Sequence, residues 1–410
     1  MSTLVLTGGV GVDGSRLGLR VDDDSGTVLD AGELVRPAEG EAVLDCTGHV
    51  VLAAPAEPHL HLDKVDTAWR LKNPTGELMD AVRVWTGGID LLDADEVRDR
   101  AVGTIDDYVA NGCTAIRSHV NLAPTSGLAP LMGLMSARAA VADRCDVQLA
   151  VLVKGPLRGD GEGPTAARAL IRRAVELGVD LVGGAPHSAP DPASDVEVLM
   201  SLAAEMGVGV DLHTDETLDP AHTSLSVMAE GADRHGLGGR TAASHCVSLS
   251  MQPVDHQLAV AARLADTGVS VMALPSTNLW LQGRQEPVGT PRGVTAVRRL
   301  LDAGVVVGAG ADNLRDPFCP AGRADPFETA TLLALTAHLS LAEAWWAATG
   351  GARQAMGLDG GTLEVGAPAD VLVARGRDLE DAIARASAER TVLRRGRLVA
   401  HTTLDRTIVR

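Results

Sequence analysis

The chain has 410 residues, of which 45% are hydrophobic and 22% charged, and this composition excludes a wholly disordered protein. It carries 36 Lys and Arg residues against 54 Asp and Glu residues, a formal net charge of −18. This balance argues against binding to nucleic acid or to an anionic membrane, because phosphate contacts need clustered cations.

The five cysteines include no CxxC pair, and 1–20 lack a basic segment followed by an apolar core. A disulfide framework and a signal peptide are therefore not expected. A reducing compartment suits such unpaired thiols, so we expect a cytoplasmic protein.

Both ends of the chain show short β-favouring runs. Strands are predicted at 4–6, 17–21, 27–29, 369–374 and 391–398, the last run holding two strands around Gly396. A helix is predicted at 379–386. Because chain ends often lie close together, we expect 1–54 and 356–410 to form one small β-sandwich domain.

Between these ends, in 55–355, apolar β runs alternate with Ala- and Leu-rich helical segments, a pattern typical of βα units with a parallel sheet. Eight strands are predicted, at 50–58, 114–120, 147–153, 181–185, 208–212, 241–244, 269–274 and 305–309. Eight such units indicate an α/β fold, a (β/α)8 TIM-type barrel that carries a metal-dependent active site.

Side chains with metal-binding or acid–base chemistry follow the carboxyl ends of these strands. They are His59, His61, His119, Lys154, His187, His213, Glu216, His245, Asn278 and Asp312. In a parallel barrel all these ends open onto one face, where the active sites of this fold lie.

His59 and His61 stand two residues apart on one strand, so both imidazoles point to the same side. With His213 and Asp312 they offer three nitrogens and one oxygen to one divalent metal. Zn2+ and Fe2+ suit this set, and Mn2+ suits it less well. Such a metal lowers the pKa of its water, and the resulting hydroxide attacks an electrophilic carbon.

Three catalytic roles follow from this hypothesis. Glu216, three residues after His213, lies close enough to the metal to carry protons. His245 is expected to hydrogen-bond the attacking water or the developing alkoxide. Asp312 is expected to act both as a ligand and as the base for the water proton.

These residues resemble the motifs of the amidohydrolase superfamily, and within it most closely those of bacterial-type cytosine deaminases. The matching segments are 59–64 (HLHLDK), 213–216 (HTDE), 244–245 (SH), Asp312, 183–187 (GGAPH), 281–284 (LQGR) and 316–318 (DPF). The likeness covers nearly the whole chain. It implies a mononuclear Zn2+ or Fe2+ site on His59, His61, His213 and Asp312, with Glu216 protonating a ring nitrogen and with ammonia as a product.

The chain differs from cytosine deaminases at the residues with which those enzymes recognise their substrate. Lys154 stands where that family has glutamine, Asn313 where it has aspartate, and Phe318 where it has tryptophan. The first two changes add about two positive charges to the pocket, because lysine is a cation and asparagine is neutral. We therefore expect a substrate with an anionic or strongly accepting group beside Lys154, and not cytosine itself.

Several interpretations stay open. His119 and His187 either contact substrate or pack at their strand ends, and Lys154 is alternatively a carbamylated lysine that bridges two metals. The leading hypothesis is an aminohydrolase for a small heterocyclic substrate. The same metal site also suits a hydrolase that cleaves the C–N bond of a cyclic or acyclic amide. A barrel scaffold without catalysis is a third hypothesis, and the sequence leaves a homo-oligomer open.

Overall fold

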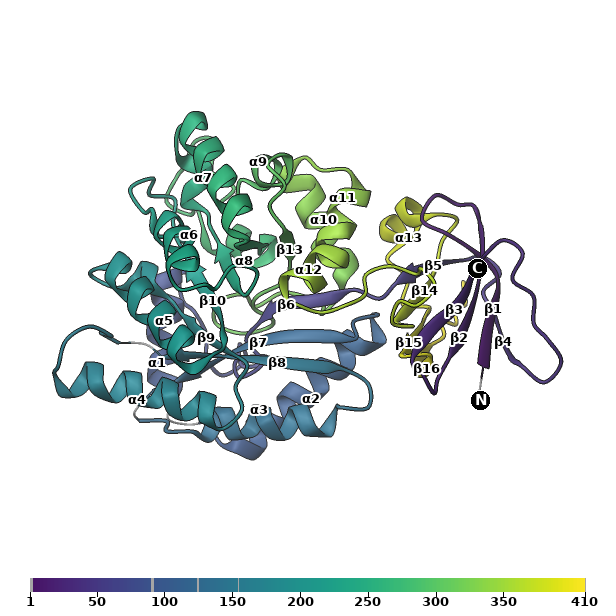
Figure 1. Cartoon of the computed structure of the whole chain (residues 1–410), viewed down its shortest axis with the longest axis horizontal. Coiled ribbons are helices and arrows are strands. Elements are labelled where there is room, and N and C mark those ends of the chain that lie inside the picture. The colour runs from purple at the N-terminus through teal and green to yellow at the C-terminus, as the bar shows by residue number, and fades with distance from the viewer. Residues whose placement is uncertain (1–2, 90–91, 124, 154, 410) are drawn as a thin grey trace.

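The computed structural model describes residues 3–89, 92–123, 125–153 and 155–409, so Lys154 lies outside the described residues. Its strands form two eight-stranded sheets, one from the middle of the chain and one from both ends. Figure 1 shows the terminal strands gathered at one side of the helix-covered barrel. The predicted fold, a (β/α)8 barrel with a small β-sandwich built from both termini, is confirmed.

The barrel sheet is parallel throughout and follows the chain order. Its strands are β6 (Ala56–Leu60), β7 (Ala115–Leu122), β8 (Asp146–Val153), β9 (Leu181–Gly184), β10 (Gly209–Thr214), β11 (Thr241–His245), β12 (Ser270–Ala273) and β13 (Val307–Ala309). All eight predicted barrel strands are present, but the first prediction was too long. The run 50–58 is divided between β6 and the end of β5 (His49–Ala53), which belongs to the terminal sheet.

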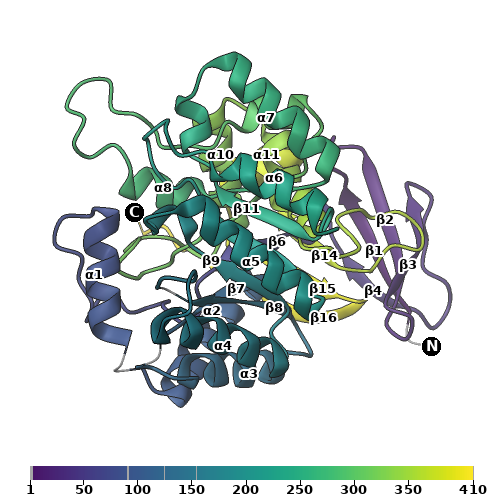
Figure 2. The same ribbon diagram turned by 60° about the vertical axis from the view of Figure 1, so that its left-hand side comes forward.

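Helices follow most of the barrel strands, and α3, α4, α5 and α6 pack on β7 to β11 (Figure 2). The first six helices are α1 (Leu78–Gly88), α2 (Ala94–Ala110), α3 (Ala129–Ala140), α4 (Glu162–Glu176), α5 (Pro192–Met206) and α6 (Ser224–Arg234). The remainder are α7 (Val254–Thr267), α8 (Pro275–Leu281), α9 (Val297–Asp302), α10 (Pro326–Ala337), α11 (Leu341–Ala348), α12 (Gly350–Ala355) and α13 (Leu379–Arg385). Among the helices in the described ranges, none combines the length and hydropathy that a membrane span requires.

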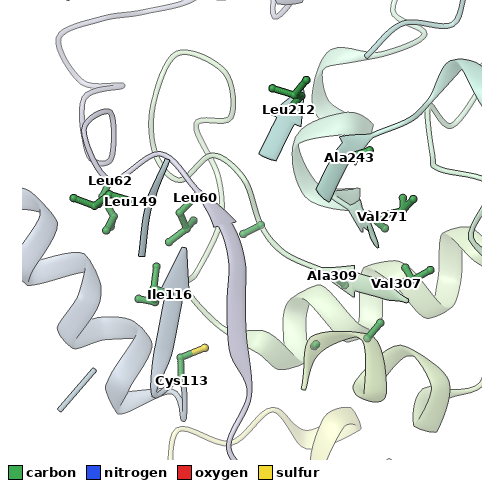
Figure 3. Packing of buried hydrophobic residues seen from close by; sticks show 14 of the residues in the cluster. Leu60, Leu62, Cys113, Ile116, Leu149, Leu212, Ala243, Val271, Val307 and Ala309 are labelled. Atoms are coloured by element: carbon green, nitrogen blue, oxygen red, sulfur yellow. The ribbon is translucent and has the colours of Figure 1, made fainter. Parts of the chain in front are cut away.

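Alternate residues of the barrel strands belong to different environments. Leu212, Ala243 and Val271, on three neighbouring strands, lie in the main hydrophobic core, as Figure 3 shows. Asp211 and His213 flank Leu212 and are buried outside this core cluster. Because successive side chains of a strand point to opposite faces, the apolar set packs on the helices while the polar set occupies the barrel interior.

The ring is closed by contacts between its first and last strands. Leu60 and Asp312 form a parallel bridge, in which the backbone N–H of Asp312 donates to the carbonyl of His59 at 3.0 Å. The buried carboxyl of Glu57 supports this junction by accepting the N–H of His59 at 3.1 Å and the N–H of Ala311 at 3.0 Å. Closure of the barrel therefore brings Asp312 next to the first-strand histidines.

The small domain takes five strands from the N-terminal end and three from the C-terminal end. They are β1 (Thr3–Val10), β2 (Arg16–Asp22), β3 (Thr27–Gly32), β4 (Ala42–Asp45), β5, β14 (Val371–Arg375), β15 (Arg390–Arg394) and β16 (Arg397–Thr402). β5 pairs with β14, which joins the two ends of the chain. The strands predicted near both termini and the helix at 379–386 are confirmed, whereas β4 had not been predicted.

Candidate metal centre and pocket

The four residues predicted to bind metal converge at the carboxyl ends of the strands. Nε2 of His61 lies 3.0 Å from Nε2 of His213 and 3.3 Å from Oδ1 of Asp312. Nε2 of His59 lies 3.5 Å from the same carboxylate oxygen. All four side chains are buried. Three imidazoles and one carboxylate thus surround a common centre, although they come from β6 and the residue that follows it, from β10, and from the segment after β13.

His245 belongs to the same group. One ligand atom from each of His59, His213, His245 and Asp312 lies within 4.8 Å of the other three. This set contains His245 in place of His61, yet the short distances from His61 to His213 and Asp312 place it at the same centre. The structure therefore offers five candidate ligands, of which the sequence analysis named four as ligands and the fifth as a catalytic residue.

The hydrogen bonding of these side chains fits a bound cation. Nε2 of His59, Nε2 of His245 and Oδ1 of Asp312 are all buried and make no hydrogen bond within the described part of the chain. Buried polar atoms are otherwise nearly always hydrogen-bonded. A divalent metal site requires lone pairs that point to one centre and are not already used to accept hydrogen bonds. Imidazole nitrogen together with carboxylate oxygen is a ligand set that Zn2+ and Fe2+ accept.

The protonation states agree with this interpretation. Burial lowers the pKa of His61 and of His213 well below the ordinary value, so both imidazoles are neutral at pH 7. Burial alone would raise the pKa of Asp312, but its contacts with His59 and His61 outweigh burial and hold the pKa well below its usual range. Neutral imidazoles and an ionised carboxylate are the forms that coordinate metals.

Two of these residues have strained backbones. His245 has φ 71° and Asp312 has φ 66°, in the left-handed region that non-glycine residues seldom adopt. Both occur where a barrel strand ends and the chain turns. Such conformations persist only where the surrounding structure enforces them, and they concentrate at functional sites.

A chain of polar contacts extends from His59 into the barrel interior. Nδ1 of His59 lies 2.8 Å from Oγ of Ser244, which in turn donates to Oδ1 of Asp211 at 2.9 Å. Asp211 also accepts Nη1 of Arg117 at 3.0 Å. All four side chains are buried. Because Ser244 uses its proton toward Asp211, its oxygen accepts the Nδ1–H of His59, and the lone pair of Nε2 faces the centre.

His119 lies below the candidate ligands. Its ring centroid is 4.3 Å from that of His59 and 4.7 Å from that of His213. Burial lowers its pKa to about 4, so the ring is neutral. His119 is fully buried and does not line the pocket described below. Its position favours packing over substrate contact, the two interpretations that the sequence had left open.

Glu216 is placed beside two histidines. Its Oε2 lies 3.7 Å from Nε2 of His245 and 3.6 Å from Nε2 of His187. The second ring nitrogen of His245 donates to Oδ1 of Asn278 at 2.9 Å, and Nδ1 of His187 lies 3.1 Å from the carbonyl of His213. Glu216 is buried, yet it lines the pocket. Its carboxyl group can therefore reach a bound molecule while it contacts His245.

A pocket of about 570 Å3 opens over this centre. Its lining includes His61, His213 and Asp312 together with His187, Asn313 and Phe318, which were predicted to contact substrate. The amide of Asn313 donates to Oδ2 of Asp316 at 2.8 Å. The remaining predicted contact, Lys154, lies outside the described residues. The volume suits a small organic molecule.

The buried partners of the histidines were not predicted from the sequence. Arg117, Asp211 and Ser244 received no role, although each is two residues or one residue away from a named histidine on the same strand. Polar residues inside largely apolar strands were the signal that the sequence offered. They alternate with Ile116, Leu212 and Ala243, and in a barrel such positions point to the interior.

Known proteins resemble this chain over nearly its whole length. A pterin deaminase of Rhizobium rhizogenes is 32% identical over 386 residues, which cover 91% of this chain and 85% of the relative. Among solved structures, a 5-methylcytosine deaminase from Klebsiella pneumoniae liganded with 5-fluorocytosine superposes with a TM-score of 0.88 at 26% identity and covers 99% of both chains. An N-isopropylammelide isopropylaminohydrolase from Burkholderia multivorans gives a TM-score of 0.83 at 26% identity, covering 98% of this chain and 99% of the other.

The family model described as "Amidohydrolase family" matches residues 137–405. The matched range includes His213, Glu216, His245 and Asp312, whereas His59 and His61 precede it. Sequence similarity, fold and the converging His and Asp side chains agree with the resemblance found in the sequence. The chain belongs to the amidohydrolase family.

Proposed function

We propose that the protein is a metal-dependent aminohydrolase that replaces an exocyclic amino group of a small nitrogen heterocycle with oxygen and releases ammonia. The observation that carries this proposal is the position of Glu216, which lines the pocket and contacts His245 beside the cluster of His and Asp residues. The relatives named above include deaminases of pterin and of 5-methylcytosine, both of which are nitrogen heterocycles.

The candidate ligands His59, His61, His213 and Asp312 would hold one divalent cation, Zn2+ or Fe2+, with Mn2+ less suited. A cation in such a site supplies Lewis acidity, which makes water a competent nucleophile near neutral pH. Their buried lone pairs and their protonation states support this assignment.

His245 is arranged to accept the proton of the attacking water. Its Nδ1–H donates to Asn278, so Nε2 carries the lone pair and faces the pocket side of the site. Nε2 lies 3.8 Å from Oδ2 of Asp312 and 3.7 Å from Glu216. Asp312 and His245 can therefore both take a proton from water at this place, and Glu216 is close enough to exchange it.

Glu216 acts as the acid of the reaction. As the water oxygen bonds to the ring carbon, the protonated carboxyl of Glu216 gives its proton to the neighbouring ring nitrogen. The C–N bond to the amino group then breaks, the amino group leaves as ammonia with a proton that came from the water, and a ring carbonyl forms. Water and the aminated ring are consumed, and the oxo ring and ammonia are produced, so atoms and charge balance.

Substrate selection would depend on the pocket residues predicted from the sequence. Asn313 and Phe318 line the pocket, and Lys154 directly follows β8 in the sequence. Neutral Asn313 together with a lysine supports a substrate bearing an anionic or accepting group, and not cytosine. Turnover of cytosine and of carboxylated heterocycles by Lys154→Gln tests this preference. An unchanged preference would remove Lys154 from the proposal.

The test of the proposed reaction is an ammonia-release screen of metal-loaded protein against aminated pyrimidines, triazines, pterins and imidazolones, with mass spectrometry of the products. We expect ammonia and an intact oxo ring. A product with a newly formed carboxylate would show an amide hydrolase with the same metal site instead. Protein that binds no divalent metal after reconstitution would contradict both.

We also propose a cytoplasmic location. All five cysteines are buried and unpaired in the structure, which suits a reducing compartment. Fractionation of the native cells would test this, and recovery of the protein outside the cytoplasm would contradict it.

A further inference from the structure

Lys64 is a buried cation in the wall of the pocket. It is 3% exposed and lines the pocket with His61, Asp312 and Phe318. Its backbone is held in place, because its N–H donates to the carbonyl of His61 at 2.8 Å and its own carbonyl accepts the hydroxyl of Thr67 at 2.6 Å. The backbone that carries this side chain is therefore anchored three residues from His61, at the edge of the candidate metal centre.

The surroundings of this ammonium group are largely aromatic. Nζ lies 4.3 Å from the ring centroid of Phe318 and 5.7 Å from that of Trp85. Aromatic faces attract a cation, but they offer no carboxylate oxygen to its N–H donors. Lys64 forms no ion pair within 4 Å in the part of the chain that the structure describes.

Neither nearby carboxylate forms an ion pair with Lys64. Oδ2 of Asp63 accepts the backbone N–H and the side-chain amide of Asn121 at 2.8 and 3.0 Å, and its Oδ1 is buried without a hydrogen bond among the described residues. Asp316 accepts the amide of Asn313 at 2.8 Å and the backbone N–H groups of Phe318 and Cys319 at 2.8 and 3.1 Å. Both acids contribute a favourable field to Lys64, yet neither forms a direct contact with it. The donors of Lys64 remain available to a molecule in the pocket.

Other cations of the described pocket lining do not fill this role. Arg284 is the remaining Lys or Arg residue there; it is exposed, stacks 4.5 Å from the ring centroid of Trp280 and donates Nε to the carbonyl of Trp280. Burial of a charge without a partner is costly, so a buried ammonium facing a pocket gains most when an acceptor binds to it.

We propose that Lys64 selects substrates whose ring carries an anionic or ionisable oxygen, such as an acidic lactam oxygen or a carboxylate, and that Nζ binds this oxygen. The inference rests on the proposed aminohydrolase function and names its substrate class. The oxygen lies against Lys64 and Phe318, while the amino-bearing carbon faces the His and Asp cluster. Lys64 is thus a specificity-determining residue distinct from Lys154.

Binding of two matched ring compounds tests the inference without turnover. Barbiturate is an anion at neutral pH, and uracil is a neutral pyrimidine of nearly the same size. Isothermal titration of the metal-loaded protein with each compound should show tighter binding of barbiturate. In Lys64→Met the affinity for barbiturate should fall about ten- to a hundredfold, the range for losing a charged hydrogen bond, and the affinity for uracil should change much less.

Two further variants make the test specific. Lys72→Met removes a lysine that is exposed and outside the pocket, and it should bind both compounds like the parent protein. Lys154→Met distinguishes the contribution of Lys154 from that of Lys64. A loss of barbiturate preference in this variant alone would overturn the inference. Metal content and thermal melting of each variant verify folding.

Parent protein that binds the two rings equally would also overturn the inference, even if Lys64→Met does not fold. If the parent protein releases no ammonia, while Lys64→Met loses the preference for barbiturate over uracil, only the proposed function is contradicted. Ammonia release with unchanged ring preference in Lys64→Met would contradict the role of Lys64 alone.

Discussion

Nδ1 of His59 lies 2.8 Å from Oγ of Ser244, and this contact determines which nitrogen of His59 faces the candidate metal centre. Ser244 donates to Asp211, and Asp211 is fixed by Arg117. A hydrogen-bond partner behind an imidazole sets its tautomer and ring orientation, and such partners typically change metal affinity ten- to a hundredfold when they are lost. The hydroxyl of Ser244 therefore connects the buried Arg117–Asp211 pair to His59 of the candidate metal centre.

The first prediction concerns Ser244→Ala. Removal of the hydroxyl leaves Nδ1 of His59 without its acceptor, so we expect metal affinity to fall about tenfold or more. Competition with a coloured chelator measures this directly. Ser250→Ala is the matched control, because the hydroxyl of Ser250 donates to the carbonyl of Val247. Equal metal affinity in both variants would show that Ser244 does not position His59.

The second prediction concerns Glu216→Gln. Glutamine preserves the shape of the side chain but cannot supply a proton, so turnover should fall about 10²- to 10⁴-fold, the usual worth of general acid–base catalysis. Metal content and melting temperature should remain close to those of the parent protein. Glu230→Gln makes the same change at an exposed position on α6 and should retain full turnover. Retained turnover in Glu216→Gln would exclude Glu216 as the acid.

The barrel could be predicted from the sequence because its strands are largely apolar runs of three to eight residues that alternate with helical segments. The histidine positions followed from the rule that parallel strands end on one face. The separation of β5 from β6 was missed because 50–56 is a continuous apolar run that crosses from one strand into the other. Only the pairing of β5 with β14 shows that the first half belongs to another sheet. Tertiary pairing, not local propensity, divides this run.

The site was less predictable than the fold. The convergence of His59, His213 and Asp312 depends on closure of the ring, which the strand order implied. The contacts of Lys64 did not follow from the sequence, because its aromatic neighbours Trp85 and Phe318 are 21 and 254 residues away along the chain. The structure buries this lysine in the pocket wall, beside the first-strand histidines.

The third prediction concerns pH and Glu343. Hydrogen bonds from Arg298, and then from the backbone and side chain of Ser340, lower the pKa of Glu343 to about 2 from an ordinary 4.5. Because the folded pKa is lowered, the stabilisation is complete above pH 4.5 and is lost as pH falls toward 2. The side chain is 40% exposed, so solvent screening limits this stabilisation to about 1 kcal/mol.

Glu343→Gln measures this contribution. Its urea-unfolding free energy should lie about 1 kcal/mol below that of the parent protein at pH 7, and the difference should shrink at pH 3. The cap on α11 and the paired Arg298 bonds are both weakened by the change. A difference that is as large at pH 3 as at pH 7 would show that the ionised carboxylate is not what stabilises this helix start.

The last prediction concerns Asp370, which joins the small domain to the barrel. Its Oδ2 accepts Nη2 of Arg353 at 3.1 Å and the hydroxyl of Thr114 at 2.9 Å, while Oδ1 accepts the backbone N–H of Arg395 at 2.8 Å. Arg353 is 2% exposed and also donates to the carbonyl of Ala54. Asp370→Asn leaves that guanidinium buried without its counter-charge, a change that typically costs about 3–5 kcal/mol.

Urea unfolding followed by circular dichroism should therefore show a large loss of stability in Asp370→Asn. Asp359→Asn makes the same substitution at an exposed position in the same part of the chain and should change the unfolding free energy by no more than about 0.5 kcal/mol. A loss of less than about 1 kcal/mol in Asp370→Asn would mean that water reaches Arg353 at this junction and replaces the carboxylate. A large loss would show that the Arg353–Asp370 pair stabilises the junction between the two sheets.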